Sequence, residues 1–310
     1  MTTVLILLAG VAAAGVGGEL FVRGAVGLAA WARVPATIVA VTVAAFATSS
    51  PELFVAISAA SAGEPAVAFG DAVGSNVVNV ALILGIALLV RPTTIQRESA
   101  RRDLPVAIGV PFATLLLVAD GSLSRFDGAL LLSAFVVWLG VTVHHARRAR
   151  ATAVEVLGET RHGLAVAQVV GGLALLVLAG RLVVVAAKAI GEHFGLDPFV
   201  VGATLVAIGT SAPELATTLA ASLKGHEEVG VGAILGSNIF NGLWIVSITA
   251  LLRPFPVTVG EVALGLGAGG LATLLLVPGP SLELRRPRGA ALVALYLLYL
   301  VLLLTFRPGG

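Results

Sequence analysis

The chain has 310 residues, of which 58% are hydrophobic and only 12% are charged, and its mean hydropathy is +1.03. Soluble domains carry about 45–50% apolar and about 25% charged residues, so this composition excludes water-soluble enzymes and nucleic-acid binders. A formal charge of +2 is too small to indicate a polyanion partner, and the absence of cysteine excludes thiolate metal sites and disulfides. We therefore expect an integral membrane protein.

Ten segments are long and apolar enough to cross a bilayer as helices, which requires about 20 mostly apolar residues. The fourth and fifth are short. In chain order they are 2–30, 36–62, 67–90, 104–119, 127–143, 163–191, 198–223, 229–252, 256–278 and 289–306. The sequence therefore predicts an all-α polytopic membrane protein with ten transmembrane helices.

The distribution of Lys and Arg predicts the orientation, because short cytoplasmic loops carry an excess of these residues. With the N-terminus outside, thirteen basic residues fall on the inner side, three on the outer side and three within predicted helices. We expect a cell-membrane protein with both termini outside and a cytoplasmic linker at 144–162. We expect the inner arginine clusters to contact anionic membrane lipid.

Two segments align without a gap at an offset of 162 residues. The first reads TSSPEL from Thr48 and ends GSNVVN at Asn79, and the second reads TSAPEL from Thr210 and ends GSNIFN at Asn241. The two copies share 13 identities in 32 positions, more than a common apolar composition would place at one offset.

The duplication divides the chain into a first repeat at 1–143 and a second repeat at 163–310, each with five spans. Because five is odd, the second repeat enters the membrane from the opposite side. Such inverted-topology repeats are typical of transporters, whose substrate site lies near the middle of the membrane.

Glu52 and Glu214 lie about half way along apolar spans, where a carboxylate costs at least about 2–3 kcal/mol and indicates function. Pro51 and Pro213 interrupt the same spans. Hydroxyls and amides accompany the glutamates: Thr48, Ser49, Ser75 and Asn79 in the first copy, and Thr210, Ser211, Ser237 and Asn241 in the second. Each hydroxyl has a structural alternative, because Ser and Thr also bond to their own helix backbone. An all-oxygen set suits hard cations such as calcium, or several monovalent ions.

These motifs resemble the two alpha-repeats of the sodium/calcium exchanger family, in the cation/calcium exchanger superfamily, and the resemblance extends over nearly the whole chain. It implies an electrogenic antiporter that exchanges three Na⁺ for one Ca²⁺ by alternating access, with no cofactor and no enzymatic activity. The family's ligand pattern falls on the ten polar residues above, within motifs at 45–79 and 207–241, and adds the backbone carbonyls of Ala45 and Ala207 as sodium ligands. We expect a monomer of the prokaryotic type without a regulatory domain, since the linker leaves no room for one.

Two departures from the family pattern affect the expected charge of the site. Asn241 stands where many bacterial and archaeal members and the potassium-dependent branch have Asp, which argues against potassium co-transport and against a third titrating carboxylate. Asp71 stands where Asn is usual. It would attract cations near the outer mouth or, in the interpretation that we favour, begin a helix whose dipole stabilises it. Asn76 and Asn238 are expected to brace the interrupted helices.

Two other functions are compatible with parts of this pattern. A proton/calcium antiporter of the same superfamily would release protons from the glutamates, but the hydroxyl-rich Thr-Ser pair beside each glutamate favours sodium. An ion channel would need a continuous pore and gains nothing from an inverted repeat. The sequence therefore favours sodium-driven calcium exchange.

Overall fold

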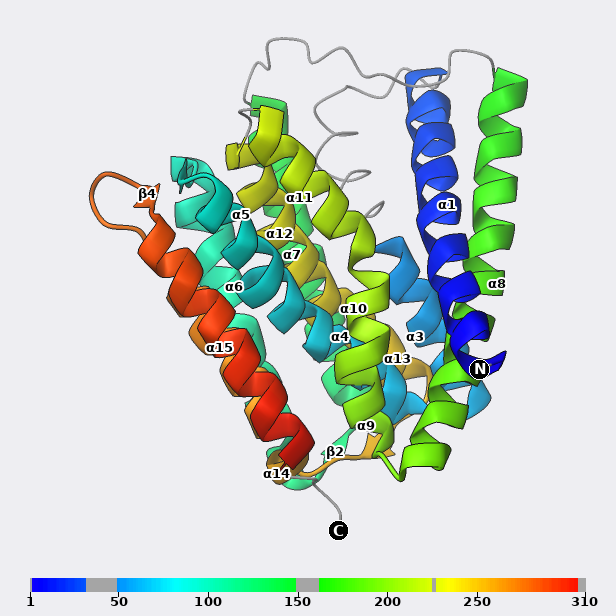
Figure 1. Cartoon of the computed structure of the whole chain (residues 1–310). Coiled ribbons are helices and arrows are strands. Elements are labelled where there is room, and N and C mark those ends of the chain that lie inside the picture. Colours follow the sequence, from blue (N-terminus) through cyan, green and yellow to red (C-terminus); the bar gives the residue numbers. More distant parts are fainter. Residues whose placement is uncertain (1, 32–48, 149–161, 225–226, 306–310) are drawn as a thin grey trace.

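The computed structural model describes residues 2–31, 49–148, 162–224 and 227–305 (Figure 1), almost all of which are helical. The helical segments are α1 (Thr2–Trp31), α3 (Ser50–Ala62), α4 (Pro65–Val77), η1 (Val78–Leu84), α5 (Gly85–Val90), α6 (Arg97–Leu117), η2 (Val118–Asp120), α7 (Arg125–Arg148), α8 (His162–Phe194), α9 (Pro198–Val201), η3 (Gly202–Val206), α10 (Ala207–Thr210), α11 (Ala212–Lys224), α12 (Glu227–Ile239), η4 (Phe240–Ile245), α13 (Val246–Leu252), α14 (Val259–Leu274) and α15 (Arg286–Thr305). The strands are β1 (Thr93–Thr94), β2 (Ser122–Leu123), β3 (Phe255–Pro256) and β4 (Glu283–Leu284).

Within the described residues, seven helical stretches are long and apolar enough to cross a membrane. The protein is therefore an all-α polytopic membrane protein. The total of ten spans stays a prediction. Part of the second predicted span lies outside the described residues, the span at 198–223 is interrupted at Ser211, and the span at 256–278 contains only the shorter helix α14.

The expectation that the fourth and fifth spans are short is wrong. Helix α6 begins at Arg97, seven residues before the predicted start, and α7 continues to Arg148, five residues beyond the predicted end. A hydropathy pattern stops at the first charged residues, whereas a helix continues past the edge of the hydrocarbon into water.

The segments that carry the two motifs are interrupted helices. Each motif contains a GSN triplet, at 74–76 and 236–238, and the backbone widens into π-helix two residues after its asparagine, in η1 and η4. It also leaves the helical region at Ser49 (φ −91°, ψ 9°) and at Ser211 (φ −78°, ψ 7°). Because both pairs of interruptions are separated by 162 residues, the sequence duplication recurs in the local backbone. π-Helical turns of this kind are frequent at functional sites.

Two short antiparallel sheets lie at opposite ends of the bundle (Figure 1). Strand β1 pairs with β4, with Thr93 opposite Leu284, and β2 pairs with β3, with Ser122 opposite Pro256. Strands β1 and β3 begin 162 residues apart, at Thr93 and Phe255. Each sheet thus joins one strand from each half of the chain, which is the arrangement that two oppositely oriented halves would produce.

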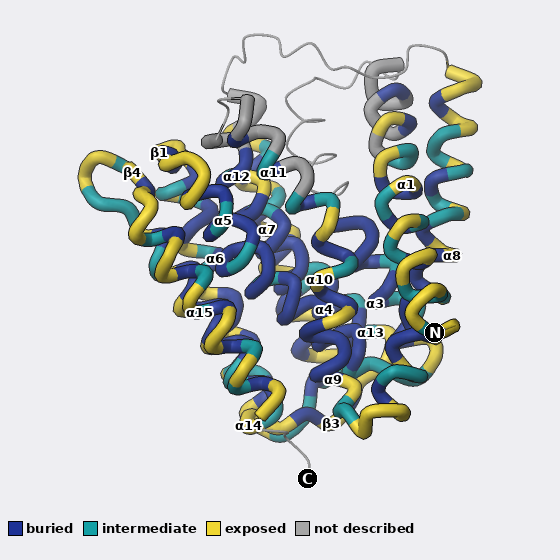
Figure 2. Tube along the Cα trace, in the orientation of Figure 1, coloured by how far each residue is buried: buried dark blue, intermediate teal, exposed yellow. Residues whose placement is uncertain are grey.

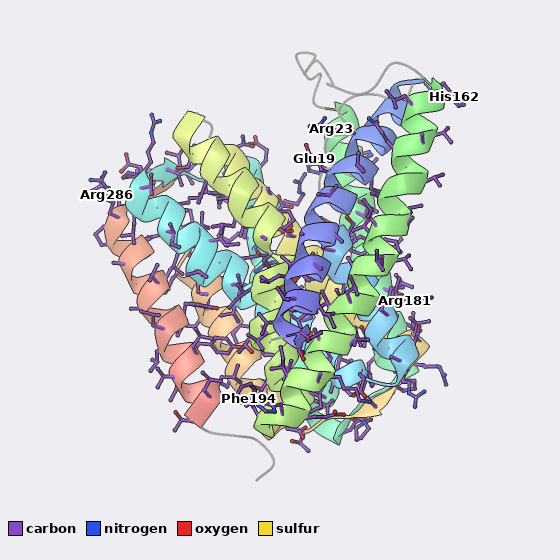
Figure 3. The ribbon with its side chains drawn as sticks, turned by 45° about the vertical axis from the view of Figure 1, so that its right-hand side comes forward. Glu19, Arg23, His162, Arg181, Phe194 and Arg286 are labelled. Atoms are coloured by element: carbon purple, nitrogen blue, oxygen red, sulfur yellow. The ribbon has the colours of Figure 1, made fainter. Side chains whose placement is uncertain are left out.

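Glycine contacts set the packing of the helices. Helices α1 and α8 lie side by side at one edge of the molecule (Figures 1 and 3), and a Cβ added at Gly172 would lie 2.5 Å from the Phe21 nitrogen. Helix α4 crosses η3 equally closely, since a Cβ at Gly74 would lie 2.5 Å from the Ala203 Cα. Small residues allow such backbone approach in membrane helices.

Burial is greatest in the centre of the molecule. Figure 2 shows α4 almost entirely buried, whereas α1, α8 and α15 alternate between exposed and buried turns. On the exposed side of α1, away from α8, Arg23 donates a hydrogen bond to Glu19 one turn earlier (Figure 3). The interrupted helices with the polar motifs therefore occupy the core, and the long regular helices surround it.

Candidate functional site

The two glutamates lie at the beginnings of helices, and not half way along continuous ones as the sequence suggested. Each is the third residue of its helix, Glu52 in α3 and Glu214 in α11, and their exposed fractions are 0% and 2%. The prolines before them, Pro51 and Pro213, suit this position, because a proline is accepted in the first turn of a helix. The positive end of each helix dipole therefore points toward a buried carboxylate.

Glu52 has no hydrogen-bond partner among the described residues. Both of its carboxylate oxygens are buried and unpaired, although the hydroxyls of Thr210 and Ser211 from the other half of the chain approach it. Ser49 is fully buried, and its hydroxyl also lacks a partner in the described part of the chain. Unpaired polar atoms in a core are costly, and this concentration of them indicates a place that receives a polar ligand.

The second half contributes hydroxyls and an amide from the same relative positions. The Ser237 Oγ donates to the Glu214 Oε1 at 3.3 Å, and the Thr210 Oγ1 lies 3.4 Å from the Ser75 Oγ, which joins the two halves. The hydroxyl of Ser211 and the whole amide of Asn241 are buried without a hydrogen bond to any described residue. Hydroxyls of the second half therefore lie beside both glutamates, Thr210 and Ser211 near Glu52 and Ser237 on Glu214.

The GSN triplets are joined by reciprocal hydrogen bonds. The Asn76 Nδ2 donates to the Asn238 carbonyl at 3.1 Å, and the Asn238 Nδ2 donates to the Asn76 carbonyl at 3.0 Å. The Asn79 Nδ2 donates to the Asn238 Oδ1 at 3.1 Å, which leaves the Asn79 Oδ1 without a hydrogen bond from the described residues. The expectation that Asn76 and Asn238 brace the interrupted helices is confirmed.

Asp71 occupies a position that the sequence interpretation missed. It is the seventh residue of α4, which begins at Pro65, and it is fully buried, so neither a helix start nor an outer mouth describes its place. Its Oδ1 accepts hydrogen bonds from the Thr210 Oγ1 at 3.0 Å and from the Ser75 Oγ at 3.3 Å. One signal for this was available, because Asp71 and Ser75 are four residues apart and so share a helix face.

Three other expected ligands complete the set. Thr48 and Ala45 lie outside the described residues. The carbonyl of Ala207, in α10, is buried and accepts the Ser211 amide at 3.1 Å. In the described part of the chain, no three His, Cys, Asp or Glu side chains come close enough together to hold a metal ion. A cation here would therefore depend on hydroxyl, amide and carbonyl oxygens as well as on carboxylates.

The fold and the site define a class of protein: a polytopic helical membrane protein whose core holds buried carboxylates among uncharged oxygens, as an ion transporter requires. The model of the sodium/calcium exchanger protein family matches residues 2–143 and 164–305. The chain belongs to this family, which consists of transporters and not of enzymes, and whose transported ions are Na⁺ and Ca²⁺.

Individual relatives agree with the family assignment. The inner membrane protein YrbG of Escherichia coli (strain K12) is 38% identical over 230 residues, which cover 71% of each chain. The putative antiporter CaxA of Alkalimonas amylolytica is 35% identical over 243 residues, which cover 76% of each chain. Among solved structures, the sodium-calcium exchanger NCX_Mj, soaked with 2.5 mM Na⁺ and 0.1 mM Ca²⁺, has a TM-score of 0.67 and 26% identity, with 99% of each chain covered. Like NCX_Mj, this chain is an exchanger of the prokaryotic type.

Proposed function

We propose that this protein is a sodium/calcium antiporter that exchanges Na⁺ for Ca²⁺ across the cell membrane by alternating access. The observation that carries the proposal is the pair of buried glutamates, Glu52 and Glu214, at equivalent helix starts. Carboxylates in a low-dielectric core are costly unless a cation compensates their charge. Both oxygens of Glu52 lack a partner among the described residues, so a cation would supply the interaction that the surrounding side chains do not.

The surrounding oxygens favour a hard cation. The proposed ligands beside the glutamates are the side chains of Thr48, Ser49, Ser75, Asn79, Thr210, Ser211, Ser237 and Asn241 and the carbonyls of Ala45 and Ala207. None of these is the nitrogen or sulfur donor that zinc or copper prefers. The similarity to the sodium-calcium exchanger NCX_Mj, which was soaked with Na⁺ together with Ca²⁺ in one structure and with Sr²⁺ in another, supports Na⁺ and Ca²⁺ as the ions.

Two inverted repeats would provide the alternating access. We place the first repeat at 1–143, the linker at 144–162 and the second repeat at 163–310, with both termini outside and the arginine-rich linker in the cytoplasm near anionic lipid. The strand pairs at opposite ends of the bundle and the reciprocal asparagine hydrogen bonds support this division. Helices α1 and α8, which pack closely on each other at one edge, are the proposed moving pair in a monomeric transporter.

The movement of Na⁺ would be coupled to that of Ca²⁺ because the two ions compete for the same ligand oxygens. If Na⁺ and Ca²⁺ use the same two glutamates, only one kind of ion occupies the site at a time. An empty site would have to carry uncompensated carboxylates through the low-dielectric region, so only loaded sites would change sides. Exchange of three Na⁺ for one Ca²⁺ moves one net charge, which makes the cycle electrogenic.

Uptake of radioactive calcium into proteoliposomes tests the function when Na⁺, K⁺ and H⁺ gradients are imposed one at a time. We expect an outward Na⁺ gradient to drive Ca²⁺ uptake against its own gradient. A positive interior potential should speed this uptake, because each cycle carries one net positive charge out of the vesicle. Uptake driven by a pH gradient without Na⁺ would replace the proposal with proton/calcium exchange. Calcium flux that only runs down its own gradient would indicate a channel.

A further inference from the structure

Asp71 is a carboxylate in the core that the proposed ligand set does not include. It has no exposed surface, and one oxygen, Oδ1, accepts both of its hydrogen bonds, from Thr210 and Ser75. The other oxygen, Oδ2, is buried and has no hydrogen-bond partner among the described residues. Asp71 forms no ion pair with any residue that the structure describes. Its charge is therefore not balanced by a basic side chain in this part of the protein.

The neighbours of Asp71 are themselves candidate ion ligands. Thr210 stands between the two acidic groups, since its hydroxyl bonds to Asp71 and also approaches Glu52. Thr210 further lies 3.4 Å from the Ser75 hydroxyl and 3.4 Å from the Ala207 carbonyl. Carboxylate, hydroxyl and carbonyl oxygens thus gather around one point beside Glu52, and hard cations bind to such oxygens.

A monovalent ion fits this point better than a divalent one. No three acidic side chains converge on one place in the described part of the chain, so Asp71 does not add a third carboxylate to a single calcium position. One carboxylate surrounded by uncharged oxygens balances one positive charge.

We propose that Asp71 is a direct ligand of one Na⁺, together with the oxygens of Ser75, Thr210 and Ala207, in a position next to the one that the glutamates form for Ca²⁺. The inference rests on the proposed exchange function. In the sodium-loaded state Asp71 would then bind Na⁺ directly. The charges of three Na⁺ would be balanced by three carboxylates, those of Asp71, Glu52 and Glu214. This contradicts the expectation, drawn from Asn241, that the site has no third carboxylate.

A purely structural role would use Asp71 only as a hydrogen-bond acceptor for Thr210 and Ser75. The substitution Asp71→Asn separates the two roles, because the amide keeps one acceptor oxygen and loses the charge. Asp71→Glu keeps the charge and changes the shape. Asp103→Asn is a matched control, since Asp103 is also buried in a membrane helix but bonds to Arg102 and Trp138 outside the site.

Equilibrium binding of radioactive calcium to the detergent-purified full chain, with increasing Na⁺ as competitor, provides the test. For Asp71→Asn we expect the Na⁺ concentration that displaces half of the Ca²⁺ to rise about tenfold or more and the Hill coefficient for Na⁺ to fall by about one. The Kd for Ca²⁺ without Na⁺ should change less than about threefold. Asp71→Glu should keep the wild-type Hill coefficient, and Asp103→Asn should behave as wild type.

Each other outcome overturns a defined claim. Unchanged Na⁺ competition in Asp71→Asn would leave Asp71 a structural acceptor, and an equal loss of Na⁺ and Ca²⁺ binding would place it at the calcium position. If wild-type protein binds no Ca²⁺ in competition with Na⁺, the proposed function itself fails. If Asp71→Asn does not fold, infrared spectra of wild-type protein with isotope-labelled aspartate provide the test. A direct ligand requires that Na⁺ shift an aspartate carboxylate band. If Na⁺ shifts no such band, the proposal is overturned.

Discussion

The two copies of the motif, residues 49–79 and 211–241, share their backbone pattern but use their serines differently. In the first copy the Ser75 hydroxyl donates to Asp71 at 3.3 Å, whereas in the second copy the equivalent Ser237 donates to Glu214 at 3.3 Å. Ala233, which corresponds to Asp71, has no carboxylate and is exposed. Ser75 therefore donates to an additional carboxylate, whereas Ser237 donates to the glutamate that has an equivalent in both copies.

This difference separates what duplication preserves from what it does not. The breaks at Ser49 and Ser211 and the π-helices η1 and η4 recur because prolines and glycines at matching positions determine the local backbone. The electrostatics need not recur, since a single change from Ala to Asp redirects a hydroxyl and adds a charge. The inverted fold thus holds a site whose two sides are chemically unequal.

The largest effect is expected where the copies are alike, at the glutamates. Glu52→Gln and Glu214→Gln each remove a charge that Na⁺ and Ca²⁺ are proposed to share. Loss of an outer partner of a metal ligand costs about 10–100-fold in affinity, so loss of the ligand itself should reduce Na⁺-driven Ca²⁺ uptake by at least about a hundredfold. Proteoliposome uptake measures this.

The control for the glutamates is Glu64→Gln, because Glu64 pairs with Lys188 at 2.7 Å outside the site. Its uptake should stay near that of wild type. Substantial exchange retained in either Glu52→Gln or Glu214→Gln would remove the basis of the shared site.

A smaller effect is expected where the copies differ, at the serines. Ser75→Ala and Ser237→Ala should each weaken Ca²⁺-competing Na⁺ binding by about tenfold, but only Ser75 bonds to Asp71. In a double-mutant cycle with Asp71→Asn, Ser75→Ala should therefore show a coupling of at least about 0.5 kcal/mol, whereas Ser237→Ala should be additive. Titration of Na⁺ against bound radioactive calcium gives both values. Equal coupling for the two serines would contradict the assignment of separate roles.

Much of this architecture could be predicted from the order of residues alone. The offset of 162 residues placed Glu52 and Glu214 at matching positions, and both are buried in the core. The apolar segments gave the helices, because burying backbone polar groups in lipid leaves few alternatives. The helix ends were less accurate, since charged residues continue a helix such as α7 beyond the membrane.

The role of Asp71 could not be predicted in the same way. Its hydrogen bond to Thr210 joins residues 139 positions apart in different halves. Hydropathy and motif spacing describe each helix separately and do not say which faces meet. The local contact with Ser75 was readable from an i, i+4 spacing, but its meaning depends on the partner across the interface.

The smallest expected effect concerns stability, at the asparagines of the two GSN triplets. Asn238 takes part in two side-chain hydrogen bonds, to the Asn76 carbonyl and from the Asn79 amide, whereas Asn76 makes one, to the Asn238 carbonyl. Hydrogen bonds between membrane helices are worth about 0.6 kcal/mol on average. Asn238→Ala should then destabilise the protein by about 1.2 kcal/mol and Asn76→Ala by about 0.6 kcal/mol, measured by reversible unfolding in mixed micelles.

The source of that inequality is a bond that only one half makes. The Asn79 amide donates to Asn238 at 3.1 Å, but its counterpart Asn241 makes no hydrogen bond to Asn76 within the described residues. In an Asn79→Ala background, Asn76→Ala and Asn238→Ala should therefore lower the free energy of unfolding by the same amount, because each then removes one hydrogen bond. If Asn238→Ala stays the more damaging change there, its extra cost arises from packing around α12, and the inequality of the two halves would extend beyond their polar contacts.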